Sequence, residues 1–390
     1  MRRYVYIFFI LNLFSNIGKG QTVYQVKSYE FAKIDNSLIL RCKNIIPVND
    51  FFLGSFKSKS TIFLYKFSLD KNPELISLKL PKVAKNYLKD YRVSEQLSYE
   101  NDTLVIRLNH LHLFYSCKSW KSPVFLGSSI FSDLTYPDFE NSNGCIYSLG
   151  LNYKDPVCPL GASQLELSSH KMKTWCFPFD FPILGALEPT NYLDITNQGF
   201  ITSQSTSYKI AFYDSLGKLN DSISLSDESV FPTLADSLLN RLEYLSKNPL
   251  NVASNLGFLQ SLRTKGAQIW QVHEIRKDLV FVKFSKPDSI RGFDVIDHVW
   301  RKQNDKWELI LSKSMSQYFA KENNLFNESE IWPIQFFGSR IFVSNGLIYY
   351  FYWGNREETI ESASSFKNHF DSDVPEESLI LRLSVIDLSE

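Results

Sequence analysis

A β-hairpin pattern that recurs along the chain is the feature that most constrains its fold. The clearest copy is Tyr208–Leu225, where two apolar-patterned runs flank the turn Asp214–Lys218. Gly217 can supply the positive φ that a tight turn between two strands needs. Looser copies occur elsewhere, at Ile62–Leu78, Leu111–Gly127, Gln164–Pro178 and Asp294–Leu311. The first four turns are about 45–52 residues apart, which is the spacing of four-stranded propeller blades.

A second pattern, a polar turn followed at once by an apolar strand, precedes most of these hairpins. The examples are Asn49–Leu53, Asn101–Ile106, Asn197–Ile201, Lys277–Phe284 and Gly338–Val343. We expect each turn to join the two inner strands of a blade, with the later hairpin as the outer pair. Aromatic residues make up 15% of the chain, which favours half-buried β structure.

The last blade is expected to take strands from both ends of the chain, because a propeller often closes its ring in this way. Leu379–Leu388 is the final strand, and Val23–Phe31 is its natural partner. Residues 355–375 between the last strands are charged and serine-rich, which predicts a long polar loop. The sequence thus predicts one all-β domain over residues 21–390, a six-bladed β-propeller, with seven blades as the alternative.

The pattern of residues 232–265 predicts a helical insertion between blades. Leu234, Leu238, Leu242 and Leu245 form a helical stripe that begins after Pro232. A weaker second helix is expected within Asn251–Arg263. We expect the leucines to pack on the propeller rim; a mobile lid over a binding face is the alternative.

The N-terminus predicts export. Arg2 and Arg3 precede the apolar run Tyr4–Phe14, and small residues follow, so residues 1–20 read as a secretory signal peptide. The alternative, an uncleaved anchor, is disfavoured because the run is shorter than the ~20 residues of a spanning helix. No other segment is apolar enough to span a membrane, so the mature chain is expected outside the cell, in the periplasm or at the cell envelope. Basic and acidic residues are equal in number, at 42 each, so the chain has no excess of positive charge that would indicate binding to nucleic acid.

Five cysteines are consistent with an oxidising compartment but leave at least one outside any internal disulfide. Cys145 and Cys158 would close a short loop, which makes them the candidate disulfide. Buried thiols on strands are an equally good interpretation. The chain has no C-x-x-C motif to suggest a structural zinc site.

Motifs for nucleotide binding, serine hydrolysis and metalloprotease chemistry are absent, and we expect no cofactor or metal. His110 and His112 have the spacing of two ligands on one strand face, but solvent-facing or hydrogen-bonded histidines are the preferred interpretation. Asp294 and Asp297 near His298 lie on a predicted outer strand, where solvent exposure is expected.

Four residues near the starts of inner strands are the candidate ligand site: Trp270, His273, Trp332 and Arg340. Together they could form an aromatic–polar platform for a sugar or a peptide near the channel. Packing between blades is the alternative for the two tryptophans.

The segment Lys209–Leu219 carries an outer turn of the type aromatic–Asp–x–x–Gly–basic, with Tyr213, Asp214, Gly217 and Lys218 in these positions. In this it resembles the secreted six-bladed β-propellers of NHL-like type from Bacteroidetes-like bacteria. Propellers of this shape serve as enzymes, lectins and scaffolds, so the resemblance implies an architecture and little about activity.

The leading functional hypothesis is a non-catalytic binding or scaffold protein for a glycan, a peptide or an envelope partner. A second hypothesis is that the protein is an inert structural or assembly partner. A hydrolase or lyase acting on a carbohydrate or lactone, with its site over the central channel, is the alternative, and the missing catalytic motifs argue against it.

Overall fold

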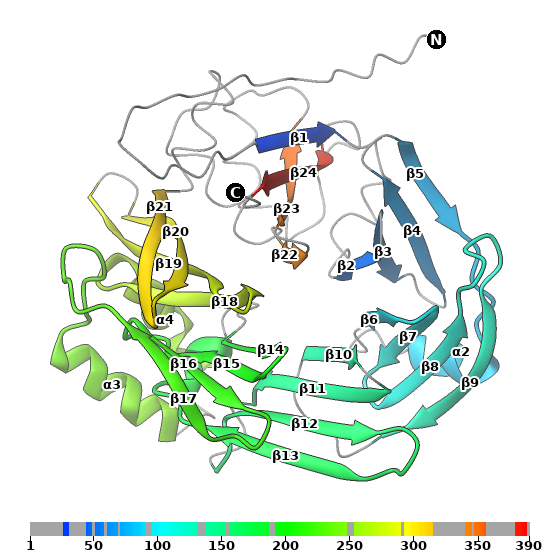
Figure 1. The fold of residues 1–390 in the computed structure, drawn as a ribbon, viewed down its shortest axis with the longest axis horizontal. Helices are drawn as coiled ribbons and strands as arrows, with labels where there is room; N and C mark the ends of the chain where they lie inside the picture. Colours follow the sequence, from blue (N-terminus) through cyan, green and yellow to red (C-terminus); the bar gives the residue numbers. More distant parts are fainter. Residues whose placement is uncertain are drawn as a thin grey trace. The chain divides into compact units, whose positions relative to one another are not determined.

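The structure is a computed structural model. It describes residues 26–30, 44–48, 51–57, 61–68, 71–89, 95–131, 138–142, 144–152, 157–186, 192–247, 253–289, 292–314, 340–344, 347–355 and 379–387. Over these ranges the strands form six four-stranded sheets (Figure 1). In five of them, neighbours in the sheet are also neighbours in the chain, as up-and-down blades require. The chain is therefore an all-β β-propeller, and it divides into two compact units.

The first unit contains three of the sheets and a short helix. Their orders are β2-β3-β4-β5, β6-β7-β8-β9 and β1-β24-β23-β22. The elements are β1 Val26–Glu30, β2 Asn44–Val48, β3 Phe51–Lys57, β4 Ile62–Ser68, β5 Lys71–Ile76, α2 Lys82–Leu88, β6 Glu95–Glu100, β7 Thr103–Leu108, β8 Leu111–Ser116, β9 Val124–Ile130, β22 Arg340–Ser344, β23 Leu347–Asn355 and β24 Leu379–Asp387.

The third of these sheets joins the two ends of the chain. β1 pairs antiparallel with β24, from Val26 opposite Ile386 to Glu30 opposite Arg382. This confirms the predicted partnership between the first and the final strand.

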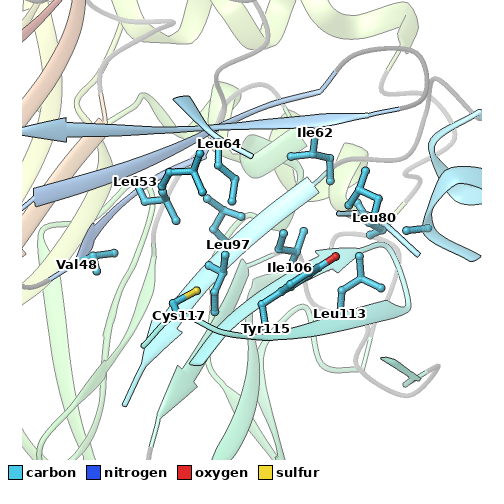
Figure 2. Packing of buried hydrophobic residues seen from close by; sticks show 14 of the residues in the cluster. Val48, Leu53, Ile62, Leu64, Leu80, Leu97, Ile106, Leu113, Tyr115 and Cys117 are labelled. Atoms are coloured by element: carbon cyan, nitrogen blue, oxygen red, sulfur yellow. The ribbon is translucent and has the colours of Figure 1, made fainter. Parts of the chain in front are cut away.

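The core of the first unit lies between the sheets β2–β5 and β6–β9 (Figure 2). Leu53 and Leu64 from one sheet and Ile106 from the other are fully buried there. Helix α2 adds Ala84 and Leu88 to the same cluster. Neighbouring sheets thus hold together by burying their facing apolar side chains.

The second unit contains the sheets β14-β15-β16-β17 and β18-β19-β20-β21 with β12 and β13, while β10 and β11 lie where the chain passes between the units. The strands are β10 Asp138–Ser142, β11 Cys145–Leu151, β12 Leu160–Glu166, β13 Met172–Phe177, β14 Leu193–Thr196, β15 Gly199–Ser203, β16 Lys209–Asp214, β17 Leu219–Ser224, β18 Gln268–Arg276, β19 Leu279–Asp288, β20 Gly292–Gln303 and β21 Lys306–Ser314.

The predicted hairpin Tyr208–Leu225 is confirmed as β16 and β17, the third and fourth strands of their sheet. The Asp214 carboxylate accepts hydrogen bonds from the backbone N–H groups of Leu216 and Lys218, both at 2.9 Å. Gly217 has a φ of 82°, the left-handed conformation that the turn requires.

The helical segment is confirmed as α3, Asp236–Lys247, and α4, Leu256–Ser261, the latter flanked by single 3-10 turns. Leu234, Leu242 and Leu245 are buried in a cluster with the 3-10 turn Pro182–Ala186. The segment is closed at its base, because Ala267 N–H donates to the Pro232 carbonyl at 2.7 Å.

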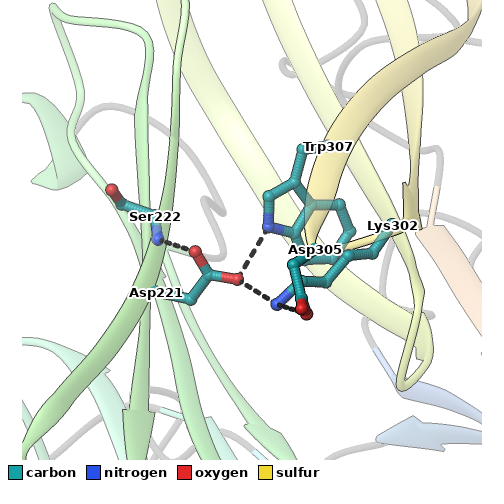
Figure 3. A network of polar contacts seen from close by, with 5 residues as sticks. All are labelled: Asp221, Ser222, Lys302, Asp305 and Trp307. Carbon is teal, nitrogen blue, oxygen red and sulfur yellow. Dashed lines mark hydrogen bonds and ion pairs between the residues drawn. The ribbon is translucent and has the colours of Figure 1, made fainter.

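Two aromatic–polar contacts link the sheets β14–β17 and β18–β21. Inside the core, the Tyr208 hydroxyl lies 2.8 Å from His298 Nδ1 and accepts a 2.7 Å hydrogen bond from Trp300 Nε1. Toward the surface, the Asp221 carboxylate accepts hydrogen bonds from Lys302 Nζ at 2.7 Å and from Trp307 Nε1 at 3.0 Å (Figure 3). Partial burial would raise the pKa of Asp221, but these donors outweigh it and lower that pKa.

The structure corrects the expected exposure of the outer-strand acids and histidine. His298 and Asp297 are fully buried and Asp294 is 8% exposed, because β20 is the third strand of a sheet covered on both faces. His112 is also buried and lies 3.1 Å from the His110 carbonyl, which agrees with a hydrogen-bonded strand histidine.

The disulfide prediction is also wrong. Cys158 pairs with Cys176, not with Cys145, because Cys176 on β13 lies opposite Gly161 at the start of β12 and so comes close to Cys158. Cys145 is buried and takes no part in this bridge.

Several predicted features lie outside the described residues, among them the signal peptide at residues 1–20 and, apart from Asn355 at the end of β23, the polar loop predicted at residues 355–375. Within the described part of the chain, no helix is long and apolar enough to cross a membrane.

The disulfide can be checked by peptide mapping of the purified protein without reduction. We expect a linked peptide containing Cys158 and Cys176, and a Cys145 that alkylates as a thiol after unfolding. Replacing both bridge cysteines by serine should lower the free energy of unfolding by about 3 kcal/mol, the loop-closure value for a bridge of this span. A linked Cys145–Cys158 peptide would refute the pairing.

Two buried histidines predict acid sensitivity. Burial lowers the pKa of His112 to about 4 and that of His298 to about 3, helped by the charges of Arg107 and Lys286 respectively. Only the unfolded chain gains these protons just below pH 6.5, so each histidine should lower the free energy of unfolding by about 1.4 kcal/mol per pH unit between pH 6 and 5.

Urea unfolding at several pH values measures this slope. Replacing His298 by Gln should flatten it, whatever the variant's stability at pH 7. The exposed His170 is the control, because His170→Asn should leave the slope unchanged. An unaltered slope in the His298 variant would contradict the assignment.

Candidate functional site

An imidazole–carboxylate pair marks the contact between two first strands of the second unit. His273 on β18 lies with its Nδ1 atom 2.9 Å from Asp194 Oδ2 on β14. Their side chains are 16% and 22% exposed, so both can meet solvent. Phe281 stacks beside the imidazole at a ring distance of 6.4 Å. The carboxylate and the phenyl ring together fix the orientation of the imidazole.

Glu274 follows in the chain and adds a second carboxyl group. Burial is the main reason that its pKa is raised. The hydrogen bond from the backbone of Asn197 opposes this effect, while the negative charges of Asp194 and Asp278 reinforce it. A carboxyl group with a raised pKa can donate a hydrogen bond under conditions where an ordinary one cannot.

Behind this pair, one face of the sheet β18–β21 carries a ladder of polar side chains, which we call the polar face. Its members are Gln268, Gln271, Lys283, Ser285 and Asp297. The strand registers place Gln268 opposite Ser285, and Gln271 opposite Lys283, which in turn faces Asp297. A register shift at Trp270 keeps both glutamines on the same face although they are three residues apart.

Lys283 and Asp297 form an ion pair in this ladder, with Nζ and Oδ1 3.0 Å apart. Their side chains are only 7% and 1% exposed. A buried lysine is tolerated when a carboxylate compensates its charge, so each partner depends on the other.

Three atoms of the polar face have no hydrogen-bond partner among the described residues. They are Gln268 Nε2, Gln271 Oε1 and Ser285 Oγ, all shielded from solvent. Buried polar atoms are hydrogen-bonded as a rule, so a cluster of such atoms points to a need for further polar groups. The face offers one amide donor, one amide acceptor and one hydroxyl within a single sheet.

The four predicted ligand residues meet different outcomes. His273 lies in the site just described. Trp270 is on the same strand, but it is only 7% exposed and its ring lies 6.4 Å from that of Phe293, so it packs in the interior. Arg340 begins β22 in the first unit. Trp332 lies outside the described residues.

The sequence pattern missed the groups that complete this site. Asp194 is 79 positions from His273, and no local motif connects the two. The polar face has a weak signal, since Gln268, Gln271 and His273 interrupt an apolar strand. Among the residues that the structure describes, no three His, Cys, Asp or Glu side chains lie close enough to hold a metal ion.

Glu274 gives a stability prediction for the site. Because its folded-state pKa is raised, the ionised carboxylate destabilises the folded chain at neutral pH, and the loss disappears below the unfolded pKa of about 4.3. Glu274→Gln, which keeps a carbonyl acceptor for Asn197, should therefore raise the free energy of unfolding at pH 7 but not at pH 4. Glu308→Gln, at an exposed position of β21, is the control, and its effect on the free energy of unfolding should not differ between pH 7 and pH 4. Urea unfolding at both pH values measures it, and a loss of stability at pH 7 would contradict the assignment.

Comparison with known proteins defines the fold without naming a family. No protein-family model matches the chain, and no curated protein matches it. Among solved structures, a "Putative exported protein" from Bacteroides fragilis is 12% identical, with a TM-score of 0.55 over 93% of this chain and 95% of that one.

Two other solved structures have lower scores. The N-terminal domain of Nup159 is 10% identical, with a TM-score of 0.42 over 95% of this chain and 96% of that one. A "putative oxidoreductase (glucose dehydrogenase)" from Thermus thermophilus is also 10% identical, with a TM-score of 0.41 over 92% of this chain and 100% of that one. Both of these scores are below 0.5, so neither structure supports an inference about this chain.

Proposed function

We propose that this chain is an exported β-propeller that binds a polar partner, a glycan or a peptide, without catalysing a reaction on it. The partner contacts His273 and Asp194 where β18 and β14 meet. The observation that carries the proposal is the clustering of hydrogen-bonding groups at this place, with three buried polar atoms unpartnered within the described residues.

Burying polar side chains against a sheet costs free energy of desolvation, and apolar residues of the same size would make the folded chain more stable. Their presence beside an accessible imidazole–carboxylate pair is therefore better explained by binding than by packing. Hydroxyl groups of a sugar and amide groups of a peptide both donate and accept, as this set of side chains requires.

The finer architecture belongs to this proposal. In it, each four-stranded sheet is one blade of the propeller, and β14 and β18 are the innermost strands of their blades. Export is supported by the predicted signal peptide and by the name of the Bacteroides relative in fold.

The test uses the mature chain, residues 21–390, on an array of oligosaccharides and on a library of random dodecapeptides. We expect reproducible binding of one class, with His273→Ala and Gln271→Leu each weakening it about tenfold, as loss of a good hydrogen bond would. His170→Asn, far along the chain in the β12–β13 turn, is the control. Binding that survives both site variants would refute this site. Conversion of a bound compound, followed by mass spectrometry, would refute the non-catalytic role.

A further inference from the structure

The last strand of the sheet β6–β9 has an unusual composition for an exposed edge. β9, Val124–Ile130, pairs with β8 on one side and has no neighbour on the other among the described strands. Its apolar side chains reach solvent: Val124 is 60% exposed, Leu126 60% and Ile130 61%. An edge of this kind invites pairing with another chain.

The other sheets show how this chain normally protects such edges. The last strands β5, β13, β17 and β21 each contain charged residues, which include Glu74, Lys173, Asp221 and Glu308. Charges on an edge strand discourage the addition of a further strand. β9 contains no charged residue, so it alone among these five strands lacks that protection.

The charges around β9 indicate the chemistry of a partner. Lys118 and Lys121 are exposed in the turn that leads into β9. Two acidic residues lie at the same end of the sheet. Glu100 ends β6, and Asp102 is in the β6–β7 turn, where its carboxylate accepts a hydrogen bond from the Tyr99 hydroxyl at 3.1 Å and its carbonyl oxygen accepts one from the Cys117 N–H at 2.7 Å. At the other end of β9, His110 is exposed and adds no negative charge.

We propose that β9 is the docking edge for an extended, apolar polypeptide segment of another protein, which adds antiparallel as a fifth strand. Antiparallel addition places the C-terminal end of the segment beside Lys118 and Lys121, so that end carries acidic residues. A second copy of this chain is the competing occupant, and the dimer measurement below distinguishes it from a segment of another protein. This surface is separate from the site at His273, and each can fail without the other.

The probe is a fluorescein-labelled peptide of alternating valine and threonine, seven residues long, followed by two aspartates. Anisotropy with the full mature chain should show saturable binding, and moving the aspartates to the N-terminus or replacing them by lysines should weaken it about fivefold. Backbone amides of β9 should also gain protection from hydrogen exchange when the peptide is bound.

Two variants and one matched control test the location. Leu126→Lys places a charge on the edge and should weaken binding at least tenfold, without changing the melting temperature, because this side chain is exposed and lies at a register shift. Leu216→Lys, at an 84% exposed turn position of β16–β17, is the matched control and should bind normally. Lys121→Glu should reverse the preference in favour of the lysine-ended peptide.

Three results would overturn the proposal. One is the absence of binding by every peptide, and another is binding that Leu126→Lys leaves unaffected. The third is a concentration-dependent dimer that Leu126→Lys dissolves in the absence of peptide, because that would assign β9 to a second copy of the chain.

Discussion

Over the described residues, the structure depends on burying the faces of its four-stranded sheets, mostly with apolar side chains. β19 shows the constraint most clearly, because Leu279 to Ser285 are buried at seven consecutive positions, which is possible only in a strand covered on both sides. At roughly 25 cal/mol per Å² of apolar surface, such interfaces supply most of the stability of the fold. They also decide which polar groups are tolerated. Lys283 persists because Asp297 is 3.0 Å away, and His298 because Tyr208 is 2.8 Å away.

Features that depend on neighbouring residues could be predicted from the sequence. The turn of β16–β17 was recognisable because Asp214 and Gly217 act within five residues, and helix α3 because its leucines repeat with a helical period. The pairing of β1 with β24 followed from the general need of a propeller to close. Features that depend on the register between distant strands could not be predicted. Cys176 lies opposite Gly161 only once β12 and β13 have paired, and the exposure expected for His298 ignored the sheet that covers β20.

The candidate site illustrates the same limit. His273 was identified from its position near the start of an inner strand, but its partner Asp194 comes from another sheet. The polar face exists because a register shift at Trp270 turns two glutamines to one side, and no sequence period encodes such a shift. The candidate site at β14 and β18 and the proposed docking edge at β9 therefore rely on different kinds of interaction with a partner. The first offers directional hydrogen bonds from side chains, and the second offers a row of backbone groups beside apolar surface.

The pairing of β1 with β24 has a consequence for how the chain reaches its native state. Five of the sheets join strands that are close in sequence, so each can form as soon as its own segment is available. The sixth must bring residues 26–30 to residues 379–387, and the entropy of closing so long a loop is recovered only when the remaining sheets already hold its ends near each other. This sheet is consequently the last to assemble. β1 therefore stays unpaired until the residues of β24 are available, although it is the first described strand of the chain.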